Sequence, residues 1–78
     1  MTDATQTPAQ NPVLMVLRKQ VIETRRAYHQ AVPGVTYEDM KAAATRYLEM
    51  KACIDRAAGR PAPKRVTSSA VAGLLRAL

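Results

Sequence analysis

The sequence predicts an all-α fold: a long antiparallel helical hairpin followed by a short C-terminal helix, with no sheet. Two observations support this prediction. Apolar residues recur with helical spacing in two long runs, and no stretch shows the alternation of a strand. Pro33 and Gly34 interrupt the chain between these runs. Because the connection is short, the two helices should lie antiparallel and pack against each other.

The first helix is expected from about Pro12 to Val32. Asn11 suits the N-cap, and Pro12 suits the first helical position because the N–H that it lacks has no helical partner there. Pro33 and Gly34 should end the helix. Its core-facing stripe follows heptad spacing and comprises Leu14, Leu17, Val21, Thr24, Tyr28 and Ala31.

The second helix should begin after Thr36 and run to Ala58. Thr36 is a good N-cap, and Asp39 three residues later completes a capping-box pattern. Gly59 readily adopts the left-handed conformation that closes a helix. The inner face is rich in small residues, which allow close approach of the first helix, and comprises Met40, Ala43, Ala44, Tyr47, Met50, Ile54, Ala57 and Ala58.

A basic linker and a short helix should complete the chain. Pro61 and Pro63 prevent a helix across residues 60–66. Thr67 or Ser68 then caps a helix that is too short to be stable alone, so it should pack on the hairpin or on a second copy, or insert into a groove of a partner. Its apolar side comprises Val71, Leu74, Leu75 and Leu78.

Four segments therefore make up the expected chain: a flexible N-terminal tail (1–11), the helical hairpin (12–59), the basic Pro-rich linker (60–66) and the C-terminal helix (67–78). The tail is polar and cannot bury enough apolar surface to offset the cost of ordering it. The chain has no Phe or Trp and much Ala, so its core should be small. A homodimer that forms a four-helix bundle would enlarge that core.

The charge balance favours a polyanionic partner. Lys and Arg number 12 against 6 Asp and Glu, which gives a net charge of +6 at pH 7. Nucleic acid, a nucleoprotein or an acidic protein face would complement this charge. Cys53 is the only cysteine and has no internal disulfide partner. With no signal-peptide or membrane-spanning pattern, we expect a cytoplasmic protein without membrane contact.

The sequence argues against an enzyme. His29 and Cys53 are the only residues of their kinds and lie near opposite ends of the expected hairpin, which excludes a catalytic pair within one chain. No Cys/His cluster offers a metal site, and no Gly-rich loop could cradle a phosphate. We therefore expect no catalytic residue, no metal, no cofactor and no small-molecule substrate.

The first helix carries most of the candidate binding residues. Rows of arginine and lysine can follow phosphates or an acidic groove, whereas the alternative is a solvated face whose long stems cover apolar surface. Met15 and Ile22 lie on the same outer side, which indicates contact with a partner or a second copy. The basic residues recur seven apart in two neighbouring rows: Arg18 with Arg25, and Lys19 with Arg26.

The segment Gly59-Arg60-Pro61 resembles the core of the AT-hook, a short motif that lies in the minor groove of A·T-rich DNA. In AT-hooks a second basic residue precedes the glycine, and Ala58 stands there in this chain. The alternative is a helix stop followed by a Pro-rich linker. In either case Arg60, Lys64 and Arg65 are candidates for phosphate contacts.

A second resemblance concerns the two helix ends. Ala27-Tyr28-His29 and Val35-Thr36-Tyr37-Glu38-Asp39 resemble the helix ends of small viral head-to-tail joining proteins. Those proteins carry a β-hairpin between the helices, which this chain lacks. The resemblance implies a structural role in a viral particle as one alternative.

The sequence thus predicts a small, non-enzymatic, basic helical protein that docks on nucleic acid or on a nucleic-acid-handling complex. One alternative is a small inhibitor, for example phage-encoded, that acts by protein–protein contact. The other is a structural subunit of a viral particle or ring. The residues expected to contact a protein partner or a second copy are Met15, Ile22, Val71, Leu74, Leu75 and Leu78.

Overall fold

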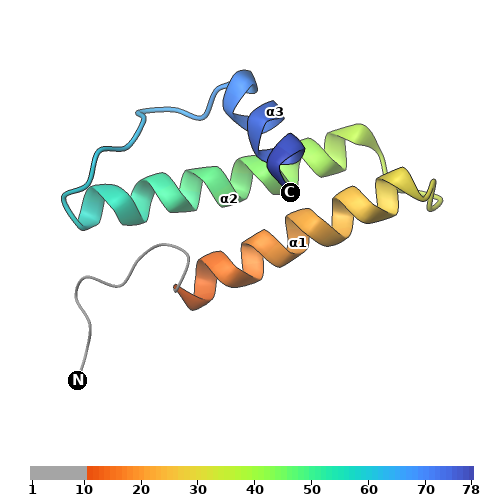
Figure 1. The fold of residues 1–78 in the computed structure, drawn as a ribbon, viewed down its shortest axis with the longest axis horizontal. Helices are drawn as coiled ribbons and strands as arrows, with labels where there is room; N and C mark the ends of the chain where they lie inside the picture. The colour runs from red at the N-terminus through yellow and green to blue at the C-terminus, as the bar shows by residue number, and fades with distance from the viewer. Residues whose placement is uncertain (1–10) are drawn as a thin grey trace.

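A computed structural model describes residues 11–78 and contains three α-helices in that range, with no strand (Figure 1). They are α1 (Pro12–His29), α2 (Tyr37–Ala57) and α3 (Ser68–Ala77). The predicted all-α class, with a long hairpin and a short C-terminal helix, is confirmed. The expected flexible tail lies outside the described residues, apart from Asn11.

The start of α1 follows the predicted cap. The Asn11 side-chain oxygen accepts hydrogen bonds from the backbone N–H groups of Val13, at 2.9 Å, and Leu14, at 3.3 Å. Pro12 occupies the first turn. These contacts satisfy two of the donors that every helix leaves unpaired at its N-terminus.

The end of α1 differs from the prediction, since the helix stops at His29 and not at Val32. Pro33 disfavours helical geometry at Val32, and its ring would clash with the carbonyl of His29 if the helix continued. The chain instead turns at Ala31, which has a left-handed φ of 56°. The N–H of Val32 then donates to the Ala27 carbonyl at 3.0 Å and closes the helix.

Both ends of α2 follow the predicted signals. The Thr36 N–H donates to Asp39 Oδ2 at 2.9 Å, and the Asp39 N–H donates to Thr36 Oγ1 at 3.2 Å, which completes the capping box. The helix ends at Ala57, with Ala58 as the cap and Gly59 in the left-handed region at φ 78°. Because Gly59 has no Cβ, it adopts this left-handed backbone conformation at little energetic cost.

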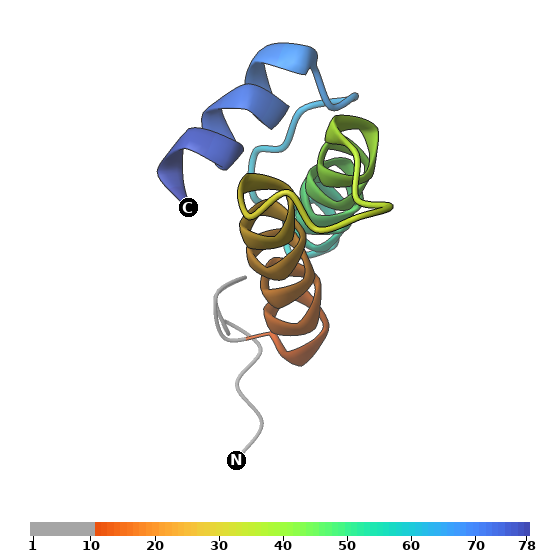
Figure 2. The ribbon, with the colours of Figure 1, turned by 90° about the vertical axis from the view of Figure 1, so that its right-hand side faces the viewer.

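The helix α3 lies across one face of the hairpin and packs on α2 (Figures 1 and 2). Thr67 caps it by accepting a hydrogen bond from the Ala70 N–H at 3.1 Å. Val71 and Leu75 are buried, so the apolar side of this helix completes the core of the chain itself. The buried residues of this core cluster are Val21, Met40, Ala43, Ala44, Val71 and Leu75.

Several residues assigned to the core faces are exposed. Tyr28 lies at the rim, with its ring 5.9 Å from that of Tyr37 in an edge-on arrangement. Ala31 lies outside the helix because α1 ends early. Toward the C-terminal end of α2 and at its cap, three residues are exposed, because α3 covers the other half of that helix: Met50, Ala57 and Ala58.

Two residues of α2 are buried although the sequence pattern did not place them in the core. They are Ala52 and Asp55. The linker, residues 60–66, returns alongside α2 and covers this side of the helix (Figure 1). Among the described residues, no helix is long and apolar enough to span a bilayer.

Candidate polyanion-binding surface

The basic side chains of α1 fall into two groups. Arg18, Lys19 and Arg26 are exposed, and no ion pair joins them to a carboxylate among the described residues. Lys19 and Arg26 lie two turns apart, about 10.5 Å along the helix axis. These three cations are therefore available to a ligand that approaches the outer side of α1.

Arg25 forms the second group, because its side chain connects α1 to α3. It is partly buried, and its Nη1 donates to the backbone oxygen of Leu78 at 3.4 Å. Arg25, His29 and Arg76 also line an open pocket of about 330 Å³ between α1, α2 and α3. We call the exposed α1 cations together with these residues the α1–α3 patch; the sequence prediction omitted Arg76, which stands in the last turn of α3.

Arg60, which the sequence suggests as a phosphate contact, is paired within the chain. Its Nε donates to Asp55 Oδ1 at 3.0 Å, and Lys51 Nζ donates to Asp55 Oδ2 at 3.0 Å. The Asp55 carboxylate is buried, so it needs these partners. The hydrogen bond from Lys51 lowers the pKa of Asp55 below its ordinary value, and the contact with Arg60 lowers it further against the opposing effect of burial.

The position of Arg60 also bears on the resemblance to the AT-hook. The resemblance would place this segment in a minor groove, whereas here the Arg60 guanidinium is directed at Asp55. The backbone N–H of Arg60 also donates to the Asp55 carbonyl at 2.8 Å. Gly59 and Arg60 therefore serve as a helix stop and an anchor for the linker.

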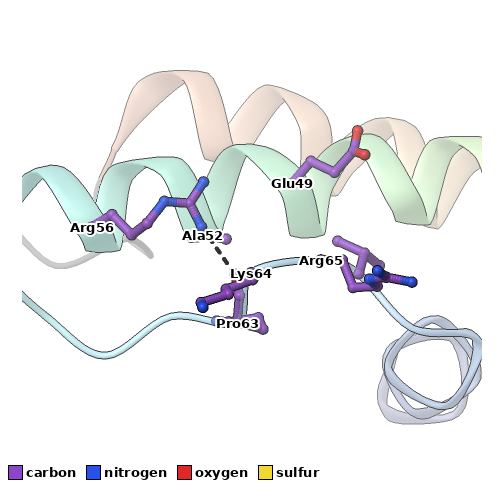
Figure 3. Close-up of a pocket in the computed structure, with 7 residues that line it drawn as sticks. Glu49, Ala52, Arg56, Pro63, Lys64 and Arg65 are labelled. Carbon is purple, nitrogen blue, oxygen red and sulfur yellow. Dashed lines mark hydrogen bonds between the residues drawn. The ribbon is translucent and has the colours of Figure 1, made fainter.

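A second anchor holds the middle of the linker. Arg56 Nη1 donates to the Pro63 carbonyl oxygen at 2.9 Å, and Figure 3 shows the Arg56 side chain reaching across to the linker. Lys64 and Arg65 follow directly and are exposed. Together with Val66 and neighbouring residues of α2, they line an open pocket of about 330 Å³, the linker pocket. Its lining residues are Glu49, Ala52, Arg56, Pro63, Lys64, Arg65 and Val66.

The structure does not bring all predicted cations together. The α1–α3 patch and the linker pocket share no residue, and no hydrogen bond joins them within residues 11–78. Each area is basic on its own. A long, flexible or branched polyanion could contact both, whereas a small anion would occupy one.

The predicted apolar contact residues also divide. Met15 is 57% exposed and Ile22 is half-buried, so Met15 is open to a partner. Val71 and Leu75 are buried in the core of the chain, and Leu74 and Leu78 pack against them. The apolar side of α3 is therefore used within the chain. The sequence prediction missed two exposed valines near the start of α1: Val13 and Val16.

The acidic residues do little to neutralise either basic area. Glu38 pairs with Lys41 at 3.4 Å, Asp39 belongs to the capping box, and Asp55 pairs with Lys51 and Arg60. Local contacts thus occupy most acids of the described chain. Glu23 on α1 and Glu49 in the linker pocket form no ion pair within residues 11–78, and cations outnumber carboxylates in both areas, which would attract an anionic surface.

Comparison with known proteins gives no functional assignment. No protein-family model, curated protein or solved structure matches the chain significantly. The charge and geometry of the molecule are therefore the basis for its proposed function.

Proposed function

We propose that this protein is a non-enzymatic binding protein that docks on nucleic acid, or on a nucleic-acid-handling complex, in the cytoplasm. The observation that supports this most is that exposed cations without acidic partners among the described residues lie on α1 and on the linker: Arg18, Lys19, Arg26, Lys64 and Arg65. Phosphate groups complement such cations, and binding releases the counterions condensed on the nucleic acid.

The outer side of α1 would supply the less specific contacts. Arg18, Lys19 and Arg26 project from a helix, so binding has to order their side chains but not the protein backbone that carries them. Arginine adds paired hydrogen bonds to a phosphate, while lysine acts as a point charge. Contacts of this kind position a protein on nucleic acid without reading its sequence.

The linker pocket would supply the better-ordered contacts. The Arg60–Asp55 pair and the Arg56–Pro63 hydrogen bond hold the linker on α2 from both sides of Pro61. Lys64 and Arg65 are therefore presented by a backbone that is already in place. Pre-organisation reduces the conformational entropy lost on binding, which favours this segment over a free basic tail.

Fluorescence anisotropy with a labelled duplex DNA and a labelled single-stranded RNA tests the proposal. Arg26→Ala and Arg65→Ala should each weaken binding, and each should reduce the slope of log Kobs against log salt by about 1. Lys41→Ala is the matched control: it also removes one positive charge, but Lys41 already pairs with Glu38. Equal effects of all three variants, or unchanged slopes for Arg26→Ala and Arg65→Ala, would contradict the proposal.

A second candidate is an inhibitor that acts by protein–protein contact, as a phage-encoded regulator of a larger machine would. The observation in its favour is the apolar start of α1, where Val13, Met15 and Val16 are 51%, 57% and 57% exposed. Binding of that kind should tolerate Lys64→Ala and Arg65→Ala. It should fail when Met15 or Ile22 is changed, which separates it from docking on nucleic acid.

A further inference from the structure

The exposed side of α2 carries a row of residues with the spacing of a coiled-coil seam. Successive members are three, four, three, four and three positions apart, so they share one face of the helix. All of them are exposed in the single chain. We call this row the α2 seam; it comprises Asp39, Ala42, Arg46, Glu49, Cys53 and Arg56.

The charges of the α2 seam are complementary to the same seam read backwards. In chain order they are negative, neutral, positive, negative, neutral and positive. A second helix in the antiparallel direction would therefore place Asp39 opposite Arg56 and Arg46 opposite Glu49. The small side chains of Ala42 and Cys53 would face each other. A twofold axis makes each of these contacts twice.

Other pairings of the same seam lack this match. In a parallel, in-register pair each residue would face its own copy, so Arg46 would meet Arg46 and Glu49 would meet Glu49. Like charges across a helix pair disfavour association, and such charge patterns set the orientation of coiled coils. Arg46 and Glu49 also form no ion pair within residues 11–78, so both remain available to a partner.

An apolar groove runs beside the seam and would supply the driving force. Leu17 of α1 and Met50 of α2 line it together with three seam residues, and its volume is about 300 Å³. Met50 is 37% exposed. Val13, about one turn before Leu17, and Val16, directly before it, are exposed as well. Covering such side chains removes apolar surface from water and stabilises an interface.

The hydrophobic core of the single chain is small, so dimerisation would add to its buried apolar surface. Within residues 11–78, Leu14 and Val21 are the only large side chains that are fully buried, and three of the other buried apolar residues are alanines: Ala43, Ala44 and Ala52. A chain of this size gains stability from any further apolar burial.

We propose that a second copy of this chain docks antiparallel along the α2 seam, with α2 against α2 and the Leu17–Met50 groove buried at the edge of the contact. Two hairpins then form a four-helix bundle. The seam differs from the surface that the sequence predicted for a dimer, which consisted of Met15, Ile22 and the apolar side of α3. It leaves Lys19, Arg26, Lys64 and Arg65 outside the row, and it borders the linker pocket, which Glu49 and Arg56 also line.

Charge reversal tests both whether a second copy binds at the α2 seam and whether it binds antiparallel. Sedimentation equilibrium of the full chain over a wide concentration range gives the dimerisation constant. Arg46→Glu alone and Glu49→Arg alone should each weaken dimerisation about tenfold or more, because each creates two like-charge contacts. The double variant, Arg46→Glu/Glu49→Arg, should restore it. Glu23→Arg is the matched control, an equal change of charge on an exposed residue of α1.

A cysteine introduced opposite Cys53 tests the register. Ala42→Cys should give a covalent dimer on mild oxidation, because the antiparallel seam places position 42 against Cys53 of the second copy. The unchanged chain should not, since its two Cys53 residues lie on opposite sides of the twofold axis. Ser69→Cys, on exposed α3, controls for random collision.

Four outcomes would overturn the proposal. A chain that stays monomeric at all concentrations has no second copy on this seam. A double charge reversal that fails to restore association excludes the antiparallel pairing. Crosslinking of Ala42→Cys no faster than that of Ser69→Cys excludes the register, as would rapid disulfide formation by Cys53 in the unchanged chain.

Discussion

The same type of backbone hydrogen bond closes the C-terminal ends of α1 and α2, but the chain follows different paths after the two helices. After α1, the N–H of Val32 donates to the Ala27 carbonyl; after α2, the N–H of Arg60 donates to the Asp55 carbonyl. Both contacts span the same number of residues and satisfy a carbonyl that the helix leaves unpaired. The first exit leads directly to the cap of α2, whereas the second leads to a linker that returns along the helix it has just left.

Different side-chain contacts hold the segments that follow the two helices. The loop between α1 and α2 is completed by the capping box of Thr36 and Asp39, which are neighbours in sequence. The linker is held by Asp55 with Arg60 and by Arg56 with the Pro63 carbonyl. Backbone closures end helices anywhere in a protein, but a buried carboxylate at one exit fixes the path of the chain. That path brings Lys64 and Arg65 into place.

The largest expected effect is that of Asp55→Ala. It leaves Lys51 and Arg60 without their shared counter-charge and releases the linker from α2. Trypsin should then cleave after Lys64 and Arg65 much faster, and the urea midpoint should fall. Glu23→Ala removes an exposed carboxylate and should change neither quantity. Equal cleavage rates in the two variants would show that Asp55 does not anchor the linker.

The same carboxylate predicts how stability depends on pH. The folded-state pKa of Asp55 lies below its unfolded-state value, so its contribution is present above the unfolded pKa and is lost as pH falls through the folded pKa. The stability difference between the natural chain and Asp55→Asn should be constant near neutrality and shrink below about pH 4. Urea unfolding at several pH values measures it. A difference that grows on acidification would contradict the sign.

A smaller effect is expected at the other exit. Thr36→Ala removes the acceptor for the Asp39 N–H and should destabilise the protein by about 1 kcal/mol. Thr36→Ser keeps the hydroxyl and should restore most of this loss. Circular dichroism during urea unfolding gives both values. A loss in the alanine variant that serine does not recover would mean that the threonine methyl group, and not the cap, carries the effect.

The smallest effect concerns the residues at the left-handed positions. Ala31 adopts φ 56° where α2 uses Gly59 at φ 78°. Ala31→Gly should stabilise the protein by up to about 1 kcal/mol, because glycine relieves the strain of this conformation. Gly59→Ala should destabilise it by about the same amount, since space for a Cβ is present and only the backbone conformation opposes it. If both substitutions change the free energy of unfolding in the same direction, the left-handed positions 31 and 59 are not equivalent.

The sequence predicts the local features of this fold well. The caps at Asn11, Thr36 and Thr67 and the stop at Gly59 are each encoded within a few residues of where they act. The early end of α1 is encoded too, because Pro33 restricts Val32, but the weight of that restriction against a continuing heptad pattern is hard to judge from one sequence.

The sequence does not predict which charges are free. Arg60 and Lys64 look alike in a basic linker, yet Arg60 is bound to a buried carboxylate and Lys64 is exposed. That difference arises because the chain turns back on α2, which buries Asp55. Likewise, the contact between Arg25 and Leu78 depends on how α3 crosses the hairpin. Side-chain pairing of this kind depends on the tertiary path and not on local spacing.

The proposed function depends above all on polyanion binding by the exposed cations of this small helical protein. The most direct test is the affinity of the natural chain for duplex DNA and for single-stranded RNA, measured by anisotropy across a range of salt concentrations. We expect binding to at least one of them, with log Kobs falling linearly and steeply as log salt rises. The absence of binding at low salt, or an affinity that does not depend on salt, would contradict it.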